Sequence, residues 1–137
     1  MARILIIDDN KLLRETVEAM LSSVGYEVVL AVDGDHGVRL FGEQHFDLVL
    51  CDVFMPKKDG METIRELRDL SAGTPIVSMT GGVARTSSAG NPAEPDFLRM
   101  TNAFGATQTI AKPFSRERLL AVVRQCLEHG SEPAGNA

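Results

Sequence analysis

Three aspartates follow apolar runs and have the chemistry to bind a metal or to react with phosphate. Asp8 and Asp9 follow one run of aliphatic residues, and Asp52 follows another. If the two runs form neighbouring parallel strands, their carboxyl ends bring all three carboxylates into one crevice. Like charges this close repel and raise one another's pKa, so the cluster needs a cation. An all-oxygen ligand set of this kind favours a hard divalent ion such as Mg²⁺.

A hydroxyl and an ammonium group end two further apolar runs. Thr80 ends the fourth run and Lys112 follows the fifth. A metal and a lysine together neutralise the oxygens of a phosphoryl group, and the threonine hydroxyl donates a hydrogen bond to another oxygen. One carboxylate then remains to attack phosphorus and form an acyl phosphate. Asp52 is the best candidate, because the adjacent pair Asp8 and Asp9 is better placed to hold the metal.

The elements that position these residues alternate between apolar runs and segments of helical period. We expect strands at 4–7, 28–32, 46–51, 76–79 and 107–111, and helices beginning near 11, 34, 60, 96 and 116. Gly25 is predicted to cap the first helix and Ser115 to begin the last. Continuous apolar runs separated by helices predict an α/β fold with a parallel sheet covered on both faces. Ligands of such sheets bind at the carboxyl ends of the strands.

Size and composition fit a single globular domain at 1–129 followed by a flexible tail at 130–137. The chain has 137 residues and a net charge of −5, which argues against direct DNA binding. No apolar run approaches the roughly 20 residues of a membrane span, and no signal-peptide layout begins the chain. Cys51 and Cys126 lie in apolar stretches and are predicted to be buried, unpaired thiols. We therefore expect a cytoplasmic location.

Together these residues resemble the receiver domain of two-component response regulators. The resemblance spans roughly residues 3–128. Its motifs are Asp8-Asp9, Asp52-x-x-Met55-Pro56-x-x-Asp59-Gly60, Thr80, and Lys112-Pro113-Phe114. It implies a flavodoxin-like, doubly wound, five-stranded parallel sheet of order 2-1-3-4-5. The stretch from Asp52 to Gly60 is a strong signal, and the four motifs in this order are highly specific.

The resemblance implies a phosphotransfer role for three of these residues. Asp52 would accept a phosphoryl group from a phosphohistidine on a sensor histidine kinase or a histidine phosphotransfer protein. Thr80 and Lys112 would bind the phosphoryl oxygens, with a cis peptide bond between Lys112 and Pro113. The chain would then catalyse only its own Mg²⁺-dependent phosphotransfer and slow autodephosphorylation, and would not be an enzyme acting on an external substrate.

The resemblance also implies a ligand set for Mg²⁺. Asp9 and Asp52 would bind the ion directly, the backbone carbonyl of Phe54 would be a third ligand, and Asp8 would act mainly through a metal-bound water. Because too few residues follow residue 128 for a second core, we expect a stand-alone receiver. It would signal by conformational change or phosphorelay through contacts with an unknown downstream protein, without touching DNA or membrane.

Two features depart from the family pattern. Thr109 stands three positions before the pocket lysine, where many receivers have an aromatic residue that swings inward on phosphorylation. The stretch 81–95 is roughly ten residues longer than is usual in the family, and long loops are often functional. We expect this stretch to remodel the usual output face.

Other readings of the same residues are weaker. Each residue alone has a plain interpretation: Asp8 and Asp9 as a helix cap, Thr80 as a strand-end hydroxyl, Lys112 as a surface lysine. Their coincidence at successive strand ends argues against it. A haloacid-dehalogenase-type phosphatase would require an aspartate where Phe54 stands, and a nucleotide binder would require a neutral phosphate loop. A phosphorylation-independent pseudo-receiver acting as a binding module stays as the alternative.

Overall fold

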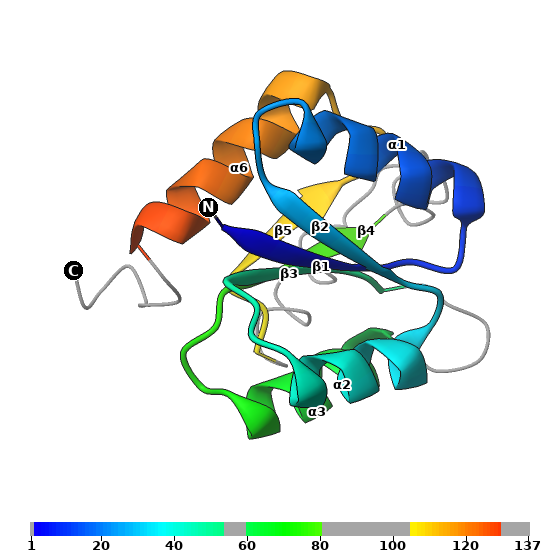
Figure 1. The fold of residues 1–137 in the computed structure, drawn as a ribbon, viewed down its shortest axis with the longest axis vertical. Coiled ribbons are helices and arrows are strands. Elements are labelled where there is room, and N and C mark those ends of the chain that lie inside the picture. The colour runs from blue at the N-terminus through cyan, green and yellow to red at the C-terminus, as the bar shows by residue number, and fades with distance from the viewer. Residues whose placement is uncertain (1, 54–59, 81–104, 130–137) are drawn as a thin grey trace, which may run out of the picture.

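The computed structural model describes residues 2–53, 60–80 and 105–129. In these residues short strands alternate with helices along the chain (Figure 1). The elements are β1 (Arg3–Ile7), α1 (Lys11–Ser22), β2 (Glu27–Ala31), α2 (Gly34–Glu43), β3 (Leu48–Asp52), α3 (Gly60–Leu70), β4 (Ile76–Thr80), β5 (Gln108–Ala111) and α6 (Arg116–His129).

The strands form one parallel sheet of order β2-β1-β3-β4-β5. Helices α1 and α6 cover one face of the sheet, and α2 and α3 cover the other (Figure 1). This is the doubly wound, flavodoxin-like α/β fold predicted from the sequence, and it is confirmed. The order places β1 and β3 side by side at the centre, so the residues that follow these two strands meet at one edge.

Two apolar layers fill the space between sheet and helices. Alternate residues of β1 enter opposite layers: Ile4 and Ile6 pack with α1 and α6, whereas Leu5 and Ile7 pack with α2 and α3. All residues of β3 and β4 are buried. Strands covered on both faces bury nearly every side chain, which explains why their sequences are largely apolar. Ser78 and the strand-end residues Asp52 and Thr80 are the polar exceptions in these two strands.

The helix starts predicted near residues 11, 34, 60 and 116 agree with the structure. Asn10 is the N-cap of α1, and its side-chain oxygen accepts a hydrogen bond from the Leu13 backbone N–H at 3.0 Å. The Ser115 hydroxyl accepts one from the Arg118 N–H at 3.0 Å at the start of α6. Gly25 has a φ of +97° in the turn after α1, a conformation that favours glycine.

The third strand begins two residues later than predicted. Phe46, expected to be its first residue, lies before β3, and its ring stacks on Phe41 of α2 with 6.2 Å between ring centroids. Phe46 is therefore apolar because it packs beneath the helix, not because it pairs in the sheet.

The helix expected near residue 96, the stretch 81–95 and the tail 130–137 lie outside the described residues. Within the described part of the chain, every helix is too short or too polar to cross a bilayer.

Candidate functional site

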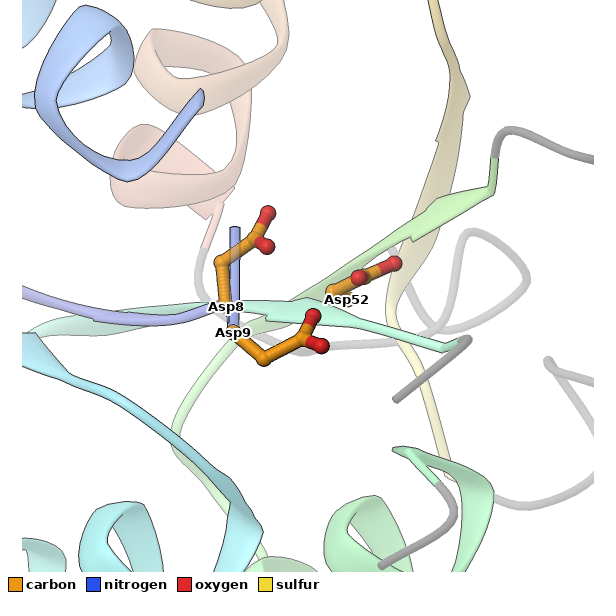
Figure 2. A group of neighbouring side chains, drawn as sticks. All are labelled: Asp8, Asp9 and Asp52. Carbon is orange, nitrogen blue, oxygen red and sulfur yellow. The ribbon is translucent and has the colours of Figure 1, made fainter. Parts of the chain in front are cut away.

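The three aspartates predicted to cluster meet at the carboxyl edge of the sheet. Ile7 of β1 pairs with Cys51 of β3, so the next residues, Asp8 and Asp52, emerge next to each other. Figure 2 shows the side chains of Asp8, Asp9 and Asp52 together at this edge. Asp8 is fully buried and Asp52 is 3% exposed, whereas Asp9 is exposed to solvent. The strand ends thus create an acidic site that is closed on one side and open on the other.

These carboxylates fit a divalent cation. One oxygen from each aspartate lies within 4.8 Å of the others, close enough for a single ion to contact more than one of them. Asp8 Oδ1 accepts the Asn10 backbone N–H at 2.8 Å, but Asp8 Oδ2 is buried and accepts no hydrogen bond from the described residues. A buried carboxylate oxygen without a donor is costly, and a metal or a metal-bound water satisfies it. The oxygen-only donor set suits Mg²⁺.

Lys112 supplies the positive charge at the same edge. Its Nζ lies 3.3 Å from Asp52 Oδ1 and 3.6 Å from Asp8 Oδ2, and its side chain is only 21% exposed. The Lys112–Pro113 peptide bond is cis, as predicted. The Lys112 backbone N–H donates to the Thr80 carbonyl at 2.6 Å, which ties the residue after β5 to the end of β4. Thr80 itself is 5% exposed, so its hydroxyl belongs to the buried end of the sheet.

Burial dominates the electrostatics of Asp8. Loss of solvent raises the pKa of its carboxyl above the ordinary 3.8; the Asn10 hydrogen bond and the Lys112 charge oppose this rise, and the Asp9 charge adds to it. The charged form of Asp8 therefore has a desolvation penalty that Lys112 and the Asn10 hydrogen bond offset only in part.

A close backbone contact fixes the chain after Asp52. The Val53 N–H donates to the Met79 carbonyl and the Gly60 N–H donates to the Val53 carbonyl, both at 3.0 Å. A Cβ atom on Gly60 would collide with the Asp52 carbonyl oxygen and would lie 2.8 Å from the Val53 carbonyl carbon. Only glycine allows α3 to begin this close to the strand that carries Asp52.

Thr109, at the position of the usual aromatic residue, forms a hydroxyl pair with its neighbour in the sheet. Its Oγ1 lies 2.8 Å from the Oγ of Ser78, the residue opposite it on β4. Ser78 is fully buried, and its hydroxyl also lies 3.4 Å from the Gln108 carbonyl oxygen, so β5 supplies both hydrogen-bond partners of this core hydroxyl. Strand register brings these two residues together, and the sequence spacing alone did not indicate it.

Arg14 of α1 also belongs to the surroundings of the site. Its Nη1 donates to the backbone carbonyl of Asp8 at 2.8 Å, and its side chain is partly buried. A basic residue shortly after an acidic pair was the only sequence signal for this contact, and it is equally typical of a solvated helix face. Phe54, expected to offer a backbone carbonyl to the metal, lies outside the described residues.

Comparison with known proteins identifies the family. The family model described as "Response regulator receiver domain" matches residues 4–124. The chain belongs to this family. It is therefore a receiver domain of the kind that serves as a phosphoacceptor module in two-component signalling.

Relatives of known name and structure agree with this assignment. The chain is 34% identical over 122 residues to the transcriptional regulatory protein DltR of Streptococcus agalactiae serotype III (strain NEM316), covering 89% of this chain and 50% of that protein. It is 38% identical over 133 residues to the response regulator MprA of Mycobacterium sp. (strain KMS), covering 97% and 54%. The chain spans about half the length of these curated relatives.

Among solved structures, the chemotaxis protein CheY4 of Vibrio cholerae superposes with a TM-score of 0.79 at 31% identity. The match covers 91% of this chain and 98% of that one. A receiver domain from Clostridium thermocellum gives a TM-score of 0.81 at 25% identity, with 94% and 96% covered. In both comparisons the aligned region includes nearly all of this chain and nearly all of the other, so the similarity extends over the whole receiver domain.

Proposed function

We propose that this receiver accepts a phosphoryl group on Asp52 from a phosphohistidine of a sensor histidine kinase or histidine phosphotransfer protein. The observation that supports this most directly is the position of Asp52. Its carboxylate lies almost buried at the central strand end, beside two further aspartates and 3.3 Å from the Lys112 ammonium. A carboxylate held between acids and a lysine has both a place for a metal and a cation for incoming phosphate oxygens.

In the proposed transfer, an Asp52 oxygen attacks phosphorus in line as the phosphorus–nitrogen bond of phosphohistidine breaks. The imidazole leaves with the bonding pair and takes up a proton, and Asp52 becomes an acyl phosphate. Lys112 would move from its carboxylate partners to the phosphoryl oxygens, and the Thr80 hydroxyl would donate to another of them. Positioning and charge neutralisation supply most of the rate.

Mg²⁺ is the metal we propose for the acidic cluster. Asp9 and Asp52 would bind it directly and Asp8 would act through a metal-bound water, with the Phe54 carbonyl as a further ligand. When bound, the ion supplies positive charge that neutralises the phosphoryl oxygens. The buried Asp8 Oδ2, which lacks a hydrogen-bond donor among the described residues, supports a need for this extra partner.

We propose that the phosphorylated receiver acts through protein contacts, by conformational change or phosphorelay, and not by binding DNA itself. The net charge of −5 supports this, since nucleic-acid binding needs a basic face. The only chemistry in this proposal is directed at the chain's own aspartate, so it is a signalling module and not an enzyme with an external substrate. Cys51 and Cys126 are buried and form no disulfide, which is consistent with a reducing compartment, and we propose the cytoplasm.

Small-molecule phosphorylation tests this function. The chain is incubated with acetyl phosphate, with Mg²⁺ or with EDTA, and its intact mass is measured over time. We expect addition of one phosphoryl group in Mg²⁺, little addition in EDTA, and none in Asp52→Asn. Asp47→Asn is the matched control, because Asp47 precedes β3 at the opposite edge of the sheet and bonds the Arg3 N–H at 2.8 Å.

Two results would count against the proposal. Wild-type protein that takes up no phosphate from acetyl phosphate or from any histidine kinase would favour the pseudo-receiver that acts only as a binding module. Uptake that persists in Asp52→Asn would move the acceptor to another residue.

A further inference from the structure

The side chain of Arg14 in α1 reaches the backbone of the acidic cluster. Its guanidinium Nη1 donates to the Asp8 carbonyl oxygen at 2.8 Å. The other polar atoms of Asp8 also have defined contacts. Its N–H donates to the Ala31 carbonyl at 3.2 Å, Oδ1 accepts the Asn10 N–H at 2.8 Å, and Oδ2 lies 3.6 Å from Lys112 Nζ.

The carbonyl that Arg14 binds has a specific importance. It belongs to the peptide group that joins Asp8 to Asp9, and peptide groups are planar. A hydrogen bond to this carbonyl therefore restrains rotation of the plane that connects the two acids. Asp8 is anchored in the sheet by its N–H, whereas Asp9 is exposed, so rotation of this plane would mainly change the direction of Asp9.

We propose that Arg14 is a positioning residue for the metal site. It holds the Asp8–Asp9 peptide plane in the orientation that keeps both carboxylates beside Asp52. The inference rests on the proposed function, because it concerns the affinity of that site for Mg²⁺. The proposal adds a residue of α1 to the groups on which the Mg²⁺ affinity of the acidic site depends.

The charge of Arg14 and its hydrogen bond have opposite effects on Mg²⁺ binding. A cation near the site repels Mg²⁺, so removing the charge alone would strengthen metal binding. Loss of the hydrogen bond would leave the Asp9 ligand less well oriented and would weaken it. The sign of the change therefore separates positioning from simple electrostatics. Outer contacts that orient metal ligands are worth about 10- to 100-fold in affinity, and for a contact through the backbone we expect about tenfold.

The test is a calorimetric titration with MgCl₂ of the wild type, Arg14→Met, Arg14→Lys and Lys11→Met at one pH and ionic strength. Lys11→Met is the matched control: it removes a positive charge from the same end of α1, where Lys11 pairs with Glu15 at 3.2 Å. We expect Arg14→Met to bind about tenfold more weakly, Arg14→Lys to lie between it and the wild type, and Lys11→Met to bind as well as the wild type or more tightly. Urea unfolding of each variant reports stability separately.

The outcomes are distinguishable. If the wild type binds Mg²⁺ and Arg14→Met binds it equally well or more tightly, the positioning role is wrong and the proposed function is unaffected. No Mg²⁺ binding by the wild type overturns both. If Arg14→Met fails to fold, Arg14→Gln takes its place, because it removes the charge and shortens the donor. Weaker binding by that variant supports positioning, and equal or tighter binding overturns it.

Discussion

Replacing Asp8 with asparagine should stabilise the metal-free protein at neutral pH. The Asp8 carboxylate is fully buried, lies within 4.8 Å of two other acids, and has one oxygen without a hydrogen-bond donor in the described part of the chain. Asparagine keeps the shape and an oxygen that can accept the Asn10 N–H, but carries no charge. Lys112 does not become unpaired in this variant, because Asp52 Oδ1 remains 3.3 Å away.

The expected size of the effect follows from the geometry. Asp8 and Asp52 each have a carboxylate oxygen within 4.8 Å of the other, so at an effective dielectric constant of about 20 they repel by at least about 3.5 kcal/mol. On the same scale Lys112 at 3.6 Å attracts Asp8 by about 4.6 kcal/mol. The attraction exceeds this minimum repulsion by only about 1 kcal/mol, and the exposed Asp9 adds a smaller, screened repulsion. What remains is the cost of burying an incompletely bonded carboxylate, so Asp8→Asn should gain about 1 to 3 kcal/mol.

The pH dependence has a definite sign. Burial raises the folded-state pKa of Asp8 above its unfolded value of 3.8. Below 3.8 the group is protonated in both states and carries no penalty; the penalty grows as the pH rises through the folded pKa and is complete above it. The advantage of Asp8→Asn should therefore be largest at neutral pH and should shrink in acid.

Urea unfolding followed by far-UV circular dichroism, in EDTA and in Mg²⁺, measures the free energy of unfolding of the wild type and of Asp8→Asn. In Mg²⁺ the wild type should gain more stability than the variant, since ligand binding to the folded state stabilises by mass action. Asp47→Asn is a control of opposite sign, because the Arg3 N–H lowers the pKa of Asp47 and its ionised form stabilises the fold above 3.8. An Asp8→Asn protein less stable than the wild type in EDTA at neutral pH would refute the reasoning.

Three further predictions concern the scaffold. The Arg68 guanidinium donates to four backbone carbonyls, including that of Gly105 at 2.7 Å, so Arg68→Met should lower the free energy of unfolding by about 2 to 4 kcal/mol. An unchanged urea midpoint would contradict this. A Cβ on Gly37 would lie 2.6 Å from Ile7 Cγ1, so Gly37→Ala should cost about 1 to 3 kcal/mol by overpacking α2 against β1. A melting temperature equal to that of the wild type would argue against that contact. Burial raises the pKa of the Cys126 thiol to about 11, so a disulfide reagent such as DTNB should label it only as fast as the protein unfolds. Rapid labelling of the native protein would show that the thiol is accessible.

The sequence was most informative where burial dictates residue type. Strands covered on both faces are largely apolar, so their runs revealed the sheet and, through it, the edge where Asp8, Asp9 and Asp52 meet. Strand boundaries were less clear, because Phe46 is apolar for packing against Phe41 and not for strand pairing.

Two contacts near the site could not be predicted from the spacing of residues in the sequence. The pair of Ser78 and Thr109 depends on the register of β4 and β5, and the contact of Arg14 with Asp8 depends on the direction of one long side chain. Neither quantity is encoded in a local pattern, since both follow from how elements pack. The roles predicted for Phe54 and for the stretch 81–95 stay predictions.

Locating the phosphorylated residue tests the central claim most directly. The chain is phosphorylated in Mg²⁺, its acyl phosphate is reduced with borohydride, and the modified residue is mapped by mass spectrometry of peptides. We predict conversion of Asp52 to homoserine, with Asp8 and Asp9 unmodified. Modification at Asp8 or Asp9, or a phosphorylated chain in which Asp52 is intact, would contradict the account.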